Sequence, residues 1–133
     1  MALKVIPGAF SLIMKSLEYA ISKGAKVSSN SYGGRSNTKI WKNVLDNNPQ
    51  HIFIVAAGND DYKITSNGLV MPCATGSDNV LCVGSSNKND ERSSFSNYGT
   101  SYVHVMAPGS SIAAPYYRST TDYAYLSGTR YLI

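Results

Sequence analysis

The sequence predicts an α/β fold in which a parallel sheet carries helices on both faces. Three observations support this prediction. The segment HIFIVAA, at residues 51–57, is continuously apolar and rich in β-branched residues, which is typical of a buried strand in a parallel sheet. Two other segments have apolar residues at helical spacing. Short connections make the strands and helices alternate, and such alternation produces βαβ units with right-handed crossovers.

The first expected elements are a strand at residues 2–6 and a helix that follows it. Pro7 and Gly8 end the strand, and Ser11 is expected to cap the helix. Gly24 is placed to close this helix in a left-handed conformation. The apolar face of the helix consists of Ile13, Leu17, Ala20 and Ile21.

A second strand is expected at residues 27–31, and a turn at residues 32–34 leads from it to a second helix. Ser36 or Asn37 is expected to cap this helix, and Asn48-Pro49 is expected to end it. Its apolar residues recur at the spacing of one helical face. They are Ile40, Trp41, Val44 and Leu45.

The central strand at residues 51–57 is expected to be covered on both faces. Shorter strands should follow, separated by loops rich in Gly, Asn and Ser, at residues 80–85, 103–106 and 112–114. The Ser-Gly-Thr sequence at residues 127–129 is expected to form a loop. Ligand sites of such sheets lie beyond the carboxyl ends of the strands, so a site is expected at the loops 32–34 and 58–60.

The composition predicts one domain with neither a nucleic-acid nor a membrane partner. A chain of 133 residues is long enough for one hydrophobic core. The net charge is +4, but the basic residues are scattered from Lys4 to Arg130 and form no patch. No apolar run approaches the about 20 residues that span a bilayer. Pro7 and Gly8 interrupt the apolar N-terminal stretch and no small-residue cleavage site follows, so no signal peptide is evident.

Two cysteines, Cys73 and Cys82, leave two interpretations open, a local disulfide or two buried thiols. No Cys/His set accompanies them, so no metal site is predicted. The two histidines, His51 and His104, are interpreted as structural. The acidic pairs Asp60-Asp61 and Asp90-Glu91 are interpreted as solvated loop residues.

Asn59 is the main candidate for chemistry. It follows the central strand through Ala57 and Gly58, whose small size lets a ligand approach the backbone. A carboxamide N–H at this position could donate a hydrogen bond to a developing oxyanion. The alternative interpretation is a turn asparagine that satisfies its own backbone. A phosphate cradle at Gly33-Gly34-Arg35 is the weaker hypothesis, since neither phosphate-binding glycine motif is present and a plain turn is favoured.

Seven segments resemble motifs of the subtilisin-like serine peptidases, the subtilases, in the family's order. The segment MALKVI, followed by a helix and GAKV, resembles the family's strand–helix–strand unit. The motif NSYGG at residues 30–34 is similar to N-S-[LW]-G-G, and IVAAGN at residues 54–59 is similar to V-A-A-A-G-N. The remaining similar segments are MPCATGSDNVLCVGSS, SSFSNYG, VHVMAPG and LSGT.

The resemblance implies a subtilisin-like fold truncated at both ends. Residues 1–133 would be a partial peptidase domain, from after the catalytic histidine up to the nucleophile loop. In the family the nucleophilic serine directly follows Ser-Gly-Thr, and Arg130 stands at that position here. The sequence contains no D-T-G or H-G-T-H motif. The implied function is a serine endopeptidase, while this chain is expected to be inactive, as a fragment or as a degenerate copy.

The resemblance also implies roles for individual residues. Asn59 would be the oxyanion-hole donor. An asparagine has this role in subtilisin, a member of the same family. Three residues would form the edge that pairs with an extended peptide or protein substrate: Ser31, Tyr32 and Gly33. Three residues would line the pocket for the side chain before the scissile bond: Ala56, Ala57 and Gly58. No cofactor is implied; structural calcium and secretion are family features for which this sequence gives no support.

Two alternatives from other classes remain open. One is a peptide-binding pseudopeptidase, in which Arg130 holds a carboxylate near Asn59. The other is a phosphate- or nucleotide-binding module that uses Gly33-Gly34-Arg35. A chain without the family's nucleophile helix should also leave the apolar faces of residues 27–31 and 51–57 uncovered, which would favour self-association.

Overall fold

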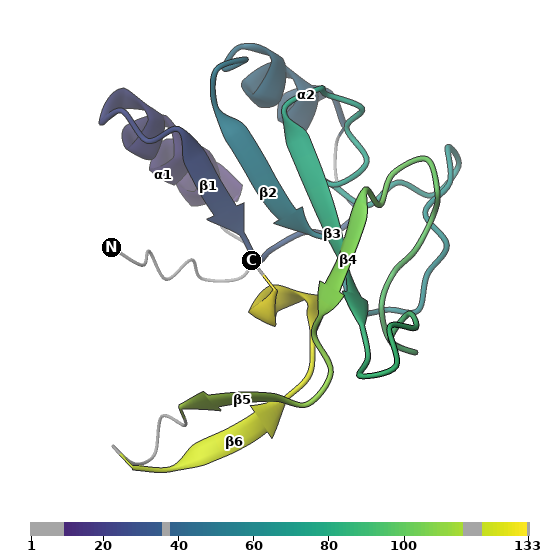
Figure 1. Cartoon of the computed structure of the whole chain (residues 1–133). Helices are drawn as coiled ribbons and strands as arrows, with labels where there is room; N and C mark the ends of the chain where they lie inside the picture. The colour runs from purple at the N-terminus through teal and green to yellow at the C-terminus, as the bar shows by residue number, and fades with distance from the viewer. Residues whose placement is uncertain (1–9, 36–37, 116–120, 133) are drawn as a thin grey trace.

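Four parallel strands form the central sheet of the protein (Figure 1). The computed structural model describes residues 10–35, 38–115 and 121–132. The strands lie in the order β1-β2-β3-β4, which confirms the parallel α/β fold. They are β1 (Val27–Asn30), β2 (Ile52–Ala56), β3 (Val80–Ser86) and β4 (Val105–Pro108). The expected strand at residues 2–6 and the caps at Ser36 and Asn37 lie outside the described residues.

The helix α1 (Phe10–Ser22) precedes β1. Ser11 was expected to cap it, but this prediction is wrong because the helix already includes Phe10. The Phe10 ring packs edge-on against Trp41 at 5.2 Å, so an aromatic contact anchors the first turn. The predicted end is confirmed. Gly24 has φ 85° and donates its N–H to Ile21 O at 2.9 Å, and the Ala25 N–H bonds to Ala20 O at 3.1 Å.

The helix α2 (Thr38–Asp46) ends two residues before the expected Asn48-Pro49 stop. Trp41 and Leu45 are buried as predicted, whereas Ile40 is 44% exposed and does not belong to the inner face. The reason is the position of Trp41, which stacks on Tyr32 at 6.0 Å and so fixes which side of the helix faces the sheet.

Both α-helices pack on one face of the sheet and lie behind it in Figure 1. One continuous core joins Leu17 of α1 and Leu45 of α2 to Phe53 and Val55 of β2. The short 3₁₀ helix η1 (Thr129–Tyr131) contacts β3 from the C-terminal part of the chain. In the described part of the protein, no helix has the length and apolar character that crossing a membrane requires.

The other face of the sheet is partly open. Val27 pairs with Ile52 in the parallel register, and Val105 lies on the same face through its pairing with Val83. Val27, Ile52 and Val105 are 51%, 49% and 44% exposed. The expectation that residues 51–57 are covered on both faces is therefore wrong for Ile52. The expectation of an uncovered apolar face is confirmed at Val27 and Ile52.

We expect this open face to bind the dye ANS and to promote self-association, because apolar patches on a folded surface attract other apolar groups. The double variant Ile52→Thr/Val105→Thr should lower ANS fluorescence and self-association, measured by fluorescence and by sedimentation. Leu12→Thr is the control, since Leu12 is similarly exposed, at 48%, but lies on α1. A wild-type chain that is monomeric and binds no ANS would contradict this prediction.

A two-stranded antiparallel sheet follows β4 and consists of β5 (Ile112–Pro115) and β6 (Tyr123–Leu126). The sequence predicted β5, whereas no strand was predicted for the segment of β6. The hairpin brings residues 127–129 back to the main sheet, where the Gly128 N–H bonds to Gly109 O at 2.9 Å. The strand expected at residues 103–106 begins later, at Val105, so His104 precedes the strand instead of lying inside it.

Candidate functional site

Asn59 meets the Ser-Gly-Thr loop at the carboxyl edge of the sheet. Its Oδ1 accepts hydrogen bonds from the Thr129 N–H at 2.9 Å and from the Thr129 hydroxyl at 3.0 Å. The two residues are 70 positions apart in the sequence. Asn59 is therefore not a turn asparagine that satisfies its own backbone. Its Nδ2 makes no hydrogen bond with any residue that the structure describes, so both of its N–H donors remain available.

Glycines make room for this contact. Gly58 has φ 103°, and a Cβ at this position would overlap the amide nitrogen of Asn97. A Cβ on Gly128 would lie 3.4 Å from Asn59 Nδ2. Glycines on both sides of the Asn59 amide therefore leave no side chain that would block access to it. This agrees with the prediction that the small size of Gly58 lets a ligand approach the backbone.

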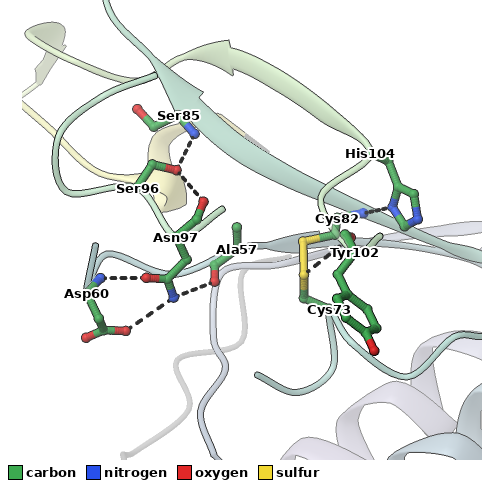
Figure 2. The surroundings of a disulfide bond; sticks show 9 residues. All are labelled: Ala57, Asp60, Cys73, Cys82, Ser85, Ser96, Asn97, Tyr102 and His104. Carbon is green, nitrogen blue, oxygen red and sulfur yellow. Dashed lines mark hydrogen bonds between the residues drawn. A yellow bond between two sulfur atoms is a disulfide. The ribbon is translucent and has the colours of Figure 1, made fainter. Parts of the chain in front are cut away.

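Asn97 holds the loop that carries Asn59 (Figure 2). Its side chain is fully buried. The Oδ1 accepts the N–H of Asp60 at 2.9 Å and of Tyr62 at 3.0 Å. The Nδ2 donates to Ala57 O at 2.9 Å and to the Asp60 carboxylate at 3.3 Å. The Asn97 backbone N–H also bonds to Gly58 O at 3.0 Å, so one residue fixes both sides of Asn59.

Ser96 connects this network to the sheet, as Figure 2 also shows. Its hydroxyl accepts the Ser85 N–H of β3 at 2.9 Å and donates to Asn97 O at 3.0 Å. The segment SSFSNYG resembles a family motif, but nothing in the sequence predicts the role of Asn97. The sequence shows only that Asn97 is a carboxamide between small and aromatic residues, and this pattern does not reveal which groups Asn97 binds.

The segment Ser31–Gly33 follows β1, an edge strand of the four-stranded sheet. The Ser31 hydroxyl donates to Arg130 O at 3.2 Å, which places this segment beside η1. The Tyr32 hydroxyl donates to Asn30 Oδ1 at 2.6 Å, and burial raises the pKa of Tyr32, so the phenol keeps its proton. A Cβ on Gly33 would lie only 2.8 Å from Met71 O, which explains the glycine.

The other predicted site residues lie close by. Ala56 and Ala57 are buried, and the Ala57 N–H bonds to Val83 O at 2.9 Å, so of the segment 56–58 only Gly58 is partly accessible. Arg130 belongs to η1 and its side chain is exposed. Within the described residues, Arg130 forms no ion pair.

The histidines are structural in their contacts. His51 is buried, and its two ring nitrogens lie 2.9 Å from Ala25 O and 2.9 Å from the Ser28 hydroxyl. His104 Nδ1 accepts the Cys82 N–H at 2.9 Å (Figure 2). These three contacts satisfy neighbouring backbone or hydroxyl groups.

The structure shows two side-chain pairings that the sequence did not establish, an ion pair and a disulfide. Asp61 is a solvated loop residue as interpreted, since its side chain is 61% exposed, and its carboxylate also forms an ion pair with Arg92 at 2.7 Å. Cys73 and Cys82 form a disulfide, which decides between the two open interpretations (Figure 2). In the described ranges, no three His, Cys, Asp or Glu residues gather in a way that could hold a metal ion.

Comparison with known proteins links the whole arrangement to one family. The model of the subtilase family matches residues 6–130. Subtilisin DY of Bacillus licheniformis is 33% identical to this chain over 124 residues. Thermitase of Thermoactinomyces vulgaris is 36% identical over 124 residues. Both matches cover 92% of this chain but only 43% and 41% of the relatives, so the chain spans less than half of their length.

Solved structures show the same fold. The prenylagaramide maturation protease PagA aligns with a TM-score of 0.77 and 23% identity, over 99% of this chain and 48% of that chain. The self-cleaved protease domain of PatA aligns with a TM-score of 0.73 and 26% identity, over 90% and 45%. The overall fold of this chain is therefore shared with solved proteases.

Proposed function

The chain belongs to the subtilase family, and we propose that its 133 residues form the substrate-binding part of a serine endopeptidase domain. The observation that carries this proposal is the contact between Asn59 and Thr129. It occupies the amide oxygen of Asn59 and leaves the N–H donors free beside the loop in which family members carry the nucleophile. Asn59 would stabilise an oxyanion, because preorganised donors act most strongly where negative charge develops.

The peptide would lie along Ser31–Gly33. This segment continues an edge strand, and an extended peptide can add to such an edge through main-chain hydrogen bonds. The Ser31 contact with Arg130 supports the placement, since it brings the peptide-pairing segment next to the position of the nucleophile. Gly58 would let the peptide backbone approach the end of β2 without a side chain in between.

Acyl transfer needs a nucleophile and a base that takes its proton. Arg130 stands where the family has the serine, and a guanidinium has neither a hydroxyl nor the ability to lose its proton near neutral pH. A peptide bound to these 133 residues would therefore stay intact. The proposed role of this segment is recognition of extended peptides and placement of the oxyanion donor.

We expect the purified 133-residue chain to show no peptidase activity, for the reason just given. The measurement is hydrolysis of a broad fluorogenic peptide library, combined with labelling by a fluorophosphonate. An active subtilisin is the positive control for both reagents. Turnover, or labelling of any serine in this chain, would contradict the assignment of Arg130 to the nucleophile position.

A further inference from the structure

A second feature of the surface lies beside the proposed peptide-binding segment. It is an open cavity of about 360 Å³. The residues that line it come from the end of the 31–35 segment and from the loop after Asn59. They are Arg35, Tyr62, Ser66, Asn67, Gly68 and Leu69. A volume of this size is at the lower end of the range for small-ligand sites, on the order of 300 Å³ or more, and is sufficient for one amino-acid side chain.

The contacts around the cavity fix its walls. Gly34 and Met71 exchange backbone hydrogen bonds at 3.0 and 2.9 Å, which holds the backbone directly before Arg35. The Arg35 guanidinium lies 4.5 Å from the centre of the Tyr62 ring. The Tyr62 N–H is held in turn by Asn97. The backbone next to Arg35 and that of Tyr62 are therefore fixed by hydrogen bonds. The stacking of the Arg35 guanidinium on the Tyr62 ring limits the motion of the guanidinium.

Arg35 has no acidic partner among the described residues. The two carboxylates nearest in sequence to Tyr62 are bound elsewhere, since Asp60 accepts from Asn97 and Asp61 pairs with Arg92. The side chains of Ser66 and Asn67 also make no hydrogen bond within the described part of the chain. The cavity thus combines a guanidinium, a hydroxyl and a carboxamide that are free to bind an anion.

We propose that this cavity binds the carboxylate side chain of a glutamate or aspartate in a peptide that lies along Ser31–Gly33. The inference rests on the proposed function and adds a substrate class to it. A guanidinium binds a carboxylate with two parallel N–H donors, and Ser66 and Asn67 supply further donors. The phosphate cradle considered for Gly33-Gly34-Arg35 is disfavoured, because the Gly34 N–H is donated to Met71 O.

The test is calorimetry with blocked, extended heptapeptides of Ala and Ser. In each peptide one position carries Glu, and a matched peptide carries Gln there. At one position we expect Glu to bind about five- to tenfold more tightly than Gln, an effect typical of a charge-assisted hydrogen bond near the surface. The preference should weaken at high salt, because ions screen exposed charges.

Variants assign the preference to the cavity. Arg35→Met should abolish the discrimination between Glu and Gln, while Arg35→Lys should retain part of it. Lys63→Ala is the matched control, since Lys63 is an exposed cation of the same loop that does not line the cavity. This control variant should discriminate as the wild type does.

The outcomes separate this inference from the proposed function. Equal binding of Glu and Gln peptides at every position would overturn the inference and leave peptide binding intact. Failure of all peptides to bind would contradict both. Inorganic phosphate or ATP that binds more tightly than the Glu peptides, and loses binding in Arg35→Met, would overturn the assignment to a peptide side chain.

Discussion

Replacing Asn97 by aspartate is expected to lower the free energy of unfolding by about 3 kcal/mol, since the change leaves a buried charge and unpaired groups in a network. The aspartate has no N–H to donate to Ala57 O, and it faces the carboxylate of Asp60. Urea denaturation at neutral pH measures the loss. The penalty should shrink as the pH falls, because a protonated carboxyl at this position regains one donor.

Asn79→Asp is the matched control for this variant. The Asn79 Nδ2 also donates to backbone oxygens and shares its two N–H groups among those of Leu45, Asn48 and His51, but it lies at the amino end of the sheet. Both variants should lose stability. Only Asn97→Asp should shift the side-chain NMR resonances of Asn59. If the two variants leave these resonances equally unchanged, Asn97 supports the fold without positioning Asn59.

Replacing Gly58 by alanine is expected to destabilise the protein by about 3 kcal/mol, from backbone strain together with a steric overlap in a packed loop. Gly58 has φ 103°, which side chains rarely tolerate, and the added Cβ would overlap the Asn97 amide nitrogen. The Asn97 side chain is fully buried and would break its hydrogen bonds if it moved aside. The thermal midpoint and the urea midpoint should both fall.

The variant Gly24→Ala separates the cost of backbone strain from the cost of the steric overlap. Gly24 also has positive φ, 85°, but a Cβ there meets no atom within 4 Å. This variant should therefore show only the backbone cost, about 1 kcal/mol. Equal losses for Gly58→Ala and Gly24→Ala would show that the contact with Asn97 has no energetic consequence.

The sequence predicted the parts of the fold that depend on local pattern. The apolar run around Phe53 and Val55 identified β2, and Gly24 identified the end of α1, because burial and left-handed backbone favour these residue types. The loops 32–34 and 58–60 were predicted at the carboxyl edge because each directly follows a predicted parallel strand. Asn59 stood out as a candidate because it follows the central strand after the small residues Ala57 and Gly58.

The remaining features depend on contacts between distant segments, and the sequence could not predict them. Asn97 binds the loop of Asn59 from 37 residues away, which no local pattern encodes. The strand β6 is four residues long and forms only through its pairing with β5. Ile40 lies outside the core because Trp41 stacks on Tyr32, a tertiary contact with the preceding turn that the helical spacing of apolar residues does not reveal.

The most direct test of the proposed function is an NMR titration of the labelled chain with a blocked, extended peptide. We expect saturable shifts of the Asn59 side-chain amide together with the backbone amides of Ser31 and Gly33. A peptide with methylated alternate amides is the control and should shift them much less, since it cannot pair with an edge strand. Shifts that are absent from Asn59 and from Ser31–Gly33, while the peptide binds elsewhere or not at all, would contradict the account.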